Sequence, residues 1–446
     1  MILSILLSLF FFIIVIVILV SVHEFGHFIT AKWAGAYVER FSIGMGPIIW
    51  KKKLGETEYC LSLIPVGGYV KILGEDPEEA DYTNPRNLQS KSFLQRLTVF
   101  AAGSVNNIIL AVIVVAFAYM IGIQMPRYLT LEPVIYWVAP GSSAESAGLT
   151  AEDRVLSVNG VSVGTWQDFM ENIGINPKGT IKLEIERKNE ILALDLKPEE
   201  IKEIGLGVVS VMHMLEPAVH NVIKDRPAEK AGIRKGDIIT EIDGQKISHW
   251  NDISLIIRSN ENSMPMAIKV QRDGEYIDFE LETDLINGVP GIGIERAPDE
   301  LTVVSYSIPT AVKESIKKCR EWILLTGRFL GNLFTNRASV RSVGGPIMIA
   351  GVSGEIGKAM LRDRFGASQF LMFLGFISLQ LGFINLLPLP VLDGGHILFL
   401  FFEKVFGRNR IKKAKVLSQT IGVILLIALA LLVFINDIIR IFATAN

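Results

Sequence analysis

Long runs of apolar residues divide the chain into membrane and soluble parts. Residues 2–30, 97–123, 370–392 and 416–435 are each predominantly apolar and reach the roughly 20 residues that a helix needs to cross a bilayer core. The pattern predicts a polytopic α-helical membrane protein with four transmembrane helices. Hydrophobic residues make up 50% of the chain and charged residues 20%, so soluble segments must alternate with these spans. The net charge of -2 gives no indication of nucleic-acid binding.

Basic residues set the expected orientation in the bilayer. Residues 32–96 contain Lys51, Lys52 and Lys53 in a row, and residues 403–415 are also rich in lysine and arginine. Cytoplasmic loops carry such an excess of basic residues, so both segments are expected inside, with both termini and residues 127–300 outside. The apolar start lacks a basic region and a small-residue cleavage site, so we expect it to be retained. Cys60 and Cys319 then lie on opposite sides and should not pair.

The long outer stretch contains a duplication. The pattern A-x-x-A-G-[LI] occurs at residues 144–149 and again at 228–233, and Trp166 and Trp250 keep the same spacing. Asn-Gly and Asp-Gly pairs follow as tight-turn signals between alternating strands. The pattern resembles bacterial PDZ domains, here expected at residues 127–210 and 211–300. PDZ domains bind extended peptides by strand addition, so peptides or protein termini are expected partners, although the glycines at 205–208 and 291–294 also suit ordinary turns.

The candidate chemistry begins where the first apolar run ends, at His23-Glu24-Phe25-Gly26-His27. His23 and His27 fall on one face of a helix, at the spacing with which two imidazoles bind one zinc ion. Glu24 lies beside them without being a ligand, and can take a proton from a water at the metal. A polar cluster at membrane depth is costly and marks a functional site. The alternative is a pair of interfacial histidines that face lipid headgroups.

A second polar cluster ends the third apolar run. Pro388 and Pro390 cannot continue a regular helix, so the backbone should break at membrane depth, which requires a cavity lined by protein. A hydrolytic zinc site uses three protein ligands. Asp393 and His396 are the candidates for the third ligand, because topology excludes the histidines of the outer stretch. Spacing alone does not choose between these two residues.

The remaining segments are less specific. Residues 39–47 and 64–72 are apolar and contain glycines, which suits hairpins that dip toward the membrane or an ordinary small sheet. Residues 305–335 predict an amphipathic helix, either on the outer membrane face or against the PDZ pair. The expected division is residues 1–126 with two helices and the hairpins, 301–368 with the amphipathic helix and a linker, and 369–446 with two helices. Within the linker region, residues 339–366 are expected to form a glycine-rich stretch and a short helix.

The pairing of H-E-x-x-H in the first span with N-x-x-P-x-P-x-L-D-G after the third resembles the site-2 protease family of intramembrane zinc metalloproteases. With its tandem PDZ domains the chain is similar to the bacterial RseP type, the regulators of sigma-E. The resemblance implies one zinc ion bound by His23, His27 and Asp393, with Glu24 as the catalytic base. It implies that a re-entrant β-hairpin holds the substrate as an added strand. The implied substrate contacts are Asn385, Pro388, Pro390, Phe41, Ile43, Gly44, Met45 and Gly46.

The implied function is regulated intramembrane proteolysis in a bacterial inner membrane, as part of a stress response. The substrates would be single-span membrane proteins already trimmed outside, such as an anti-sigma factor, and remnant signal peptides. The family's G-P-x-x-N motif appears here as Gly103-Ser104-Val105-Asn106-Asn107, without its proline. The residues alone also allow a metal-binding membrane scaffold whose PDZ pair captures peptides, or a metal transporter, although a single ligand cluster argues against transport.

Overall fold

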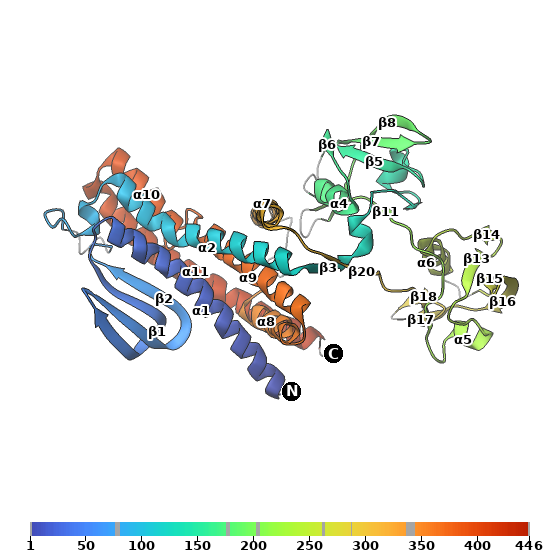
Figure 1. The fold of residues 1–446 in the computed structure, drawn as a ribbon, viewed down its shortest axis with the longest axis horizontal. Coiled ribbons are helices and arrows are strands. Elements are labelled where there is room, and N and C mark those ends of the chain that lie inside the picture. The colour runs from blue at the N-terminus through green and yellow to red at the C-terminus, as the bar shows by residue number, and fades with distance from the viewer. Residues whose placement is uncertain are drawn as a thin grey trace. The chain divides into compact units, whose positions relative to one another are not determined.

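Four helices in the described part of the chain are long and apolar enough to cross a membrane, as the hydrophobic pattern predicted (Figure 1). The computed structural model describes residues 2–75, 81–174, 179–201, 206–260, 264–286, 288–335 and 344–444. The chain divides into two compact units, Met1–Gln124 with Val303–Asn446, and Met125–Thr302. The four helices all belong to the first unit: α1 (Ile2–Trp33), α2 (Phe93–Ile121), α9 (Arg364–Asn385) and α11 (Arg408–Thr444).

The core of the first unit lies between α1, α2 and α9. Buried Val15 and Leu19 of α1 pack with Val114 of α2 and Leu374 of α9. A Cβ on Gly375 of α9 would come within 2.5 Å of the Val115 side chain, so the missing side chain lets the two helices approach closely. The apolar side chains of α11 are mostly exposed, as expected for a helix that faces lipid.

Three further helices complete this unit: α7 (Ile308–Phe334), α8 (Pro346–Met360) and α10 (Asp393–Phe406). The predicted amphipathic helix forms as α7, and its Ala311 and Cys319 are buried against residues of α2 and α9. The sequence did not predict this contact with the membrane helices. The short helix expected within residues 339–366 forms as α8, and residues 336–343 lie outside the described residues.

The N-terminus of α8 is held by a carboxylate from α11. Asp437 is 2% exposed, and it accepts hydrogen bonds from the backbone N–H groups of Gly345, Ile347 and Met348 at 2.9, 3.0 and 3.1 Å. These are groups that a helix leaves without partners at its start. The charge also lies at the positive end of the helix dipole. Asp437 therefore ties α8 to the lipid-facing helix α11.

A small sheet follows α1, built from β1 (Val38–Leu54) and β2 (Thr57–Ile72). Both long strands turn back on themselves, so the first half of β1 lies between the two halves of β2. Phe41 pairs with Val70 on one side and with Tyr59 on the other. The turn in β1 uses Gly44 and Gly46, whose φ values of 86° and 82° favour glycine. The second half of β2 is therefore an outer strand of this sheet, and it lies against α1.

The second unit contains two PDZ-like domains with the same topology, as the duplication predicted. One four-stranded sheet has the order β6-β5-β7-β8, and the other has the order β14-β13-β15-β16. Each domain has its own buried apolar core. Each also buries one aspartate against an arginine: Asp153 with Arg187 at 2.6 Å, and Asp237 with Arg272 at 2.7 Å. The repeated ion pair supports the view that the two domains arose by duplication.

The remaining elements are short. Single 3-10 turns cover Leu88–Ser90 and Arg127–Thr130. The helices are α3 (Ser143–Ser146), α4 (Trp166–Gly174), α5 (Pro227–Ala231) and α6 (Trp250–Ser259). The strands before the second repeat are β3 (Ile123–Pro126), β4 (Trp137–Val138), β5 (Arg154–Val158), β6 (Val161–Ser162), β7 (Ile181–Arg187), β8 (Glu190–Leu196), β9 (Glu199–Ile201), β10 (Leu206–Val208) and β11 (Val211–Met212). Those that follow are β12 (Asn221–Val222), β13 (Ile238–Ile242), β14 (Gln245–Lys246), β15 (Met266–Arg272), β16 (Glu275–Leu281), β17 (Asp284–Ile286), β18 (Val289–Gly291), β19 (Ile294–Glu295) and β20 (Leu301–Val304).

Candidate metal centre

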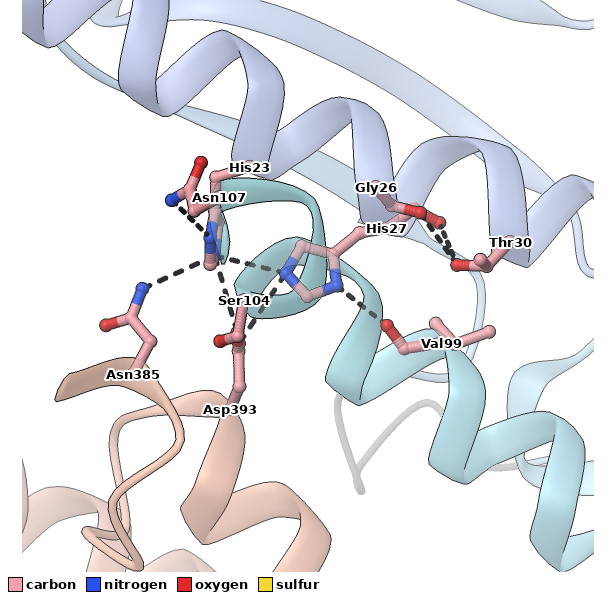
Figure 2. A network of polar contacts seen from close by, with 9 residues as sticks. All are labelled: His23, Gly26, His27, Thr30, Val99, Ser104, Asn107, Asn385 and Asp393. Carbon is pink, nitrogen blue, oxygen red and sulfur yellow. Dashed lines mark hydrogen bonds and ion pairs between the residues drawn. The ribbon is translucent and has the colours of Figure 1, made fainter. Parts of the chain in front are cut away.

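Two imidazoles meet on one face of α1, one turn apart. The helix continues past its apolar run to Trp33, so His23 and His27 project to the same side, toward α2 and the start of α10 (Figure 2). Their Nε2 atoms lie 3.2 Å apart. His23 is 8% exposed, so the pair lies inside the protein rather than on a lipid-facing surface. This burial argues against two histidines that merely face headgroups.

A carboxylate from the far end of the chain completes the group. Asp393 is the first residue of α10, and its Oδ2 and Oδ1 lie 3.4 Å from His23 Nε2 and 3.5 Å from His27 Nε2. The helix begins after a broken segment, residues 386–392, as the two prolines predicted. That segment folds tightly onto Gly394 and Gly395, where an added Cβ would come within 2.2 and 2.1 Å of backbone oxygens. The two glycines therefore allow the loop to place Asp393 beside the imidazoles.

These three donors fit a tetrahedral zinc ion. Ligand atoms about 2.0–2.1 Å from zinc lie about 3.3–3.4 Å from one another in a tetrahedral site. The two Nε2 atoms lie 3.2 Å apart, and the carboxylate presents a different oxygen to each imidazole, Oδ2 at 3.4 Å from His23 Nε2 and Oδ1 at 3.5 Å from His27 Nε2. Two imidazoles and one carboxylate are also a donor set that hydrolytic zinc sites use, with the fourth position open to water. In the described part of the chain this trio forms a group that could hold a metal ion.

Contacts from α2 orient the two imidazoles. His27 Nδ1 lies 2.8 Å from the backbone oxygen of Val99, so Nδ1 carries the proton and Nε2 keeps its lone pair for a metal. The amide Nδ2 of Asn107 lies 3.3 Å from His23 Nδ1, while the Oδ1 of Asn107 is buried with no partner among the described residues. A half-turn of this amide would let Oδ1 accept the Nδ1 proton, which satisfies both groups and frees Nε2 of His23.

The carboxylate has its own support from α2. Ser104 Oγ donates to Asp393 Oδ2 at 2.9 Å. Ser104 occupies the position of the proline that the family motif would place here, so the loss of that proline introduces a hydroxyl that holds the third ligand. Beside it, Gly103 makes room for the site, because an added Cβ would lie 2.3 Å from His27 Nε2. Sequence reasoning assigned no role at the metal to Gly103, Ser104 or Asn107, although the G-S-x-x-N spacing was a usable signal.

Glu24 lies between the metal group and the outer strand of the sheet. It follows His23 on α1, and a Cβ added to Gly68 of β2 would lie 3.3 Å from Glu24 Cγ and 3.0 Å from a methyl carbon of Val20. Since Gly68 pairs with Ile43 on its other side, the strand edge of β2 runs past the glutamate. Glu24 is therefore adjacent to both the candidate metal site and a β-strand edge.

The other predicted site residues fall into two groups, one near the metal group and one inside the small sheet. Asn385, the last residue of α9, lies with its Nδ2 3.5 Å from His23 Nε2, and Pro388 and Pro390 lie in the broken segment. The role of the residues around Phe41 and Ile43 in holding the substrate stays a prediction. Both residues are paired on each side, because β1 turns back through its two glycines and places them inside the sheet.

The alternative third ligand, His396, lies outside the metal group. Its ring lies 5.0 Å from the ring of Phe100, centroid to centroid, and its buried Nδ1 has no partner among the residues that the structure describes. Starting a helix at Asp393 places His396 nearly one turn further along, where it meets the side of α2. Geometry therefore selects Asp393, which spacing alone could not do.

A buried His-His-Asp group with an adjacent glutamate, set among membrane helices, defines a multi-pass membrane metallohydrolase. Comparison with protein families extends this result: the chain matches the model of peptidase family M50 over residues 11–429. The chain belongs to this family, so it is a zinc metalloprotease, and the resemblance drawn from its two motifs is confirmed. The group of His23, His27 and Asp393 is therefore the candidate metal centre of this protease.

Curated relatives match along almost the whole chain. "Protease RseP" of Yersinia pestis is 33% identical over 98% of this chain and 100% of its own length. "Regulator of sigma-E protease RseP" of Escherichia coli K12 is 34% identical over 95% of this chain and 96% of its own length. A relative from Pasteurella multocida, 34% identical over the same shares, is named as a zinc metalloprotease.

Solved structures of PDZ domains match part of the chain. The PDZ domain of an SdrC-like protein from Listeria innocua is 31% identical, covers 19% of this chain and 97% of that domain, and has a TM-score of 0.18. The corresponding domain from Listeria monocytogenes is 26% identical over 19% of this chain and 90% of that domain, with a TM-score of 0.18.

Proposed function

We propose that this protease hydrolyses a peptide bond within or near the transmembrane segment of single-span membrane proteins. The observation that carries the proposal is the position of Glu24, which follows the candidate ligand His23 on α1 and lies against Gly68 of the outer strand. A membrane helix hides its peptide bonds in its own hydrogen bonds, so a substrate must unwind before it is cut. A strand edge next to the site can replace the lost hydrogen bonds.

His23, His27 and Asp393 would hold one zinc ion. When bound, zinc would act as a Lewis acid, which lowers the pKa of a water molecule and polarises the substrate carbonyl. Glu24 accepts the proton of the attacking water and returns it to the leaving amine. Ser104 keeps the Asp393 carboxylate oriented through its 2.9 Å hydrogen bond. Asn385, 3.5 Å from His23 Nε2, is placed to donate to a substrate carbonyl oxygen at the site.

The outer strand of β2, residues 68–72, is the proposed docking edge for the unwound substrate. It pairs with β1 on one side, and within the described residues no strand pairs with its other side. Met45, Leu63 and Ile64 at the turns of the sheet are 48%, 60% and 49% exposed, which suits a re-entrant hairpin whose tip enters lipid. N-methylation of the substrate backbone around the cleaved bond should therefore slow cleavage. Unchanged cleavage of the N-methylated substrate would exclude strand addition.

The relatives are named as regulators of sigma-E, so the proposed substrate is an anti-sigma factor already trimmed outside, together with remnant signal peptides. The basic loops support an orientation with the metal centre near the cytoplasmic side of the inner membrane and with the PDZ-like domains and both termini in the periplasm. We propose that these domains bind peptides or protein termini and exclude bulky outer domains. Deletion of residues 127–300 should then allow cleavage of untrimmed substrate, and continued discrimination would rule out this role.

The substitution Glu24→Gln tests the proposed chemistry. The variant should retain zinc, because Glu24 is not a ligand, and lose about 10²–10⁴-fold in cleavage of a purified membrane-helix substrate, the usual contribution of a general base. Glu355→Gln is the matched control, because Glu355 is exposed on α8 and belongs to neither the metal group nor the sheet. Undiminished cleavage by Glu24→Gln would dismiss Glu24 as the base. Loss of zinc would assign it a structural role instead.

A further inference from the structure

A small cavity lies where α2 begins and α10 ends, away from the metal centre. Its volume is about 140 Å³. The start of α2, the last turns of α10 and the first residue of α11 all contribute to its wall. The lining residues are Phe93, Arg96, Leu400, Glu403, Lys404 and Arg408. The cavity therefore lies at the end of the helical unit where three membrane-associated segments meet.

Arg96 brings a buried guanidinium with an unused donor to this cavity. Its side chain is 2% exposed, and Nη1 lies 2.8 Å from Glu403 Oε2. Its buried Nε has no hydrogen-bond partner among the described residues. A guanidinium has five N–H donors, and a buried donor without an acceptor is unfavourable. One carboxylate therefore leaves the donor capacity of Arg96 only partly used, and an anion in the cavity could accept the remaining hydrogen bonds.

The lining is also positively charged. Lys404 Nζ lies 4.8 Å from the centre of the Phe93 ring, and the Arg408 guanidinium lies 4.8 Å from the centre of the Tyr82 ring. Neither cation has a carboxylate partner in the described part of the chain. Three cations thus face a single carboxylate, Glu403, which is already paired with Arg96. The excess charge favours an anion rather than a metal ion.

The surroundings identify the class of anion. Two arginines and a lysine suit a phosphate group, whose oxygens accept the forked donors of guanidinium. The ring of Phe401 lies 5.1 Å from that of the lining residue Phe93 and is 47% exposed, and Leu94 and Val405, next in sequence to lining residues, are 68% and 72% exposed. An apolar surface beside a phosphate-binding pocket suits acyl chains. We propose that the cavity binds a phosphate group, supplied by the headgroup of an anionic phospholipid, with free phosphate as the other source of the same chemistry.

Titrations of the full chain in neutral detergent test the site, with bound lipid counted by native mass spectrometry. The probes are dioleoylphosphatidylglycerol, dioleoylphosphatidylcholine and inorganic phosphate. The variant Lys404→Ala/Arg408→Ala removes two exposed cations and leaves the Arg96–Glu403 pair in place. The control Lys52→Ala/Lys53→Ala removes the same charge from exposed positions of β1, outside the cavity. Zinc content and thermal unfolding show that each variant is folded, and Arg408→Ala alone serves if the double variant is not.

The parent chain should bind phosphatidylglycerol at least about tenfold more tightly than phosphatidylcholine, and the double variant should lose about tenfold or more of that affinity, the effect of one charge-assisted hydrogen bond. The control should bind as the parent does. Failure of inorganic phosphate to compete supports the lipid as ligand, whereas competition supports a site that recognises the phosphate alone. Equal binding by parent and double variant, or an equal loss in the control, would overturn the proposal.

Discussion

Gly103 keeps open the space in which the metal ligands meet, and filling that space is a sharp test of the site. A Cβ at this position would lie 2.3 Å from His27 Nε2 and 2.8 Å from His23 Nε2. Non-bonded heavy atoms prefer a separation of about 3.5 Å or more, so Gly103→Ala must displace His27 Nε2 by about 1 Å. Zinc sites tolerate deviations of only about 0.2 Å. We therefore expect the variant to lose His27 as a ligand.

The loss of affinity can be bounded from below. Removing an outer contact to a zinc ligand costs about 10–100-fold in affinity, so displacing the ligand itself should cost at least about 100-fold, or about 2.8 kcal/mol. The substitution should not destabilise α2 itself, because alanine is more favourable than glycine inside a helix by about 1 kcal/mol. The variant should thus be folded and deficient in zinc.

Competition with a chelator, followed by zinc analysis of the full chain in detergent, measures this affinity, and thermal unfolding reports the fold. Gly327→Ala on α7 is the matched control, because no atom of the described residues lies within 4 Å of the added Cβ. It introduces the same change of residue at a helical position without a clash. Zinc binding by Gly103→Ala at the parent's affinity would refute the placement of the ligands around Gly103.

Three further predictions concern other contacts. Ser104→Ala should lower zinc affinity about 10–100-fold, because it removes the hydrogen bond that holds the Asp393 carboxylate. The same chelator titration measures this affinity, with Ser353→Ala on α8 as the control. An unchanged affinity would show that Ser104 does not support the carboxylate. Asp437→Ala should destabilise the chain by about 1–2 kcal/mol through loss of the cap on α8; a thermal midpoint equal to the parent's would count against it. Burial lowers the pKa of His213 and of His249, which meet through a 2.9 Å hydrogen bond from the His249 ring to the His213 backbone oxygen. The pKa of each histidine is lower in the folded protein than the unfolded value of about 6.5, so the unfolded chain binds more protons below that pH. The contribution of the two histidines to the free energy of unfolding is therefore complete above pH 6.5. It falls at lower pH, by up to about 1.4 kcal/mol per pH unit for each group. Hydrogen exchange of α6 at pH 7.5 and pH 5.5 measures this, and equal protection at both values would contradict it.

Patterns with strong local signals predicted most of the fold. The apolar runs located α1, α2, α9 and α11, and the duplication located the two PDZ-like domains. Pro388 and Pro390 predicted the break before α10, because proline interrupts a regular helix whatever the tertiary contacts around it. These features depend on composition and spacing within one segment, which a single sequence displays directly.

Contacts made between segments could not be predicted in the same way. Spacing alone did not choose between Asp393 and His396, since the choice depends on how the loop packs onto Gly394 and Gly395, and only the family resemblance favoured Asp393. The support from Ser104 and Asn107 requires the register of α2 against α1. The free edge of the sheet could not be located from the sequence, because only the pairing of both halves of β2 with β1 shows which strand lies outside.

The central claim is that His23, His27 and Asp393 together bind a single zinc ion, and X-ray absorption at the zinc edge tests it most directly. The purified full chain should show about one zinc with only nitrogen and oxygen neighbours at about 2.0–2.1 Å, including two imidazoles. Asp393→Ala should lose an oxygen neighbour from the zinc or lose the zinc itself. A sulfur neighbour in the parent, or a spectrum unchanged by Asp393→Ala at full zinc content, would contradict the account.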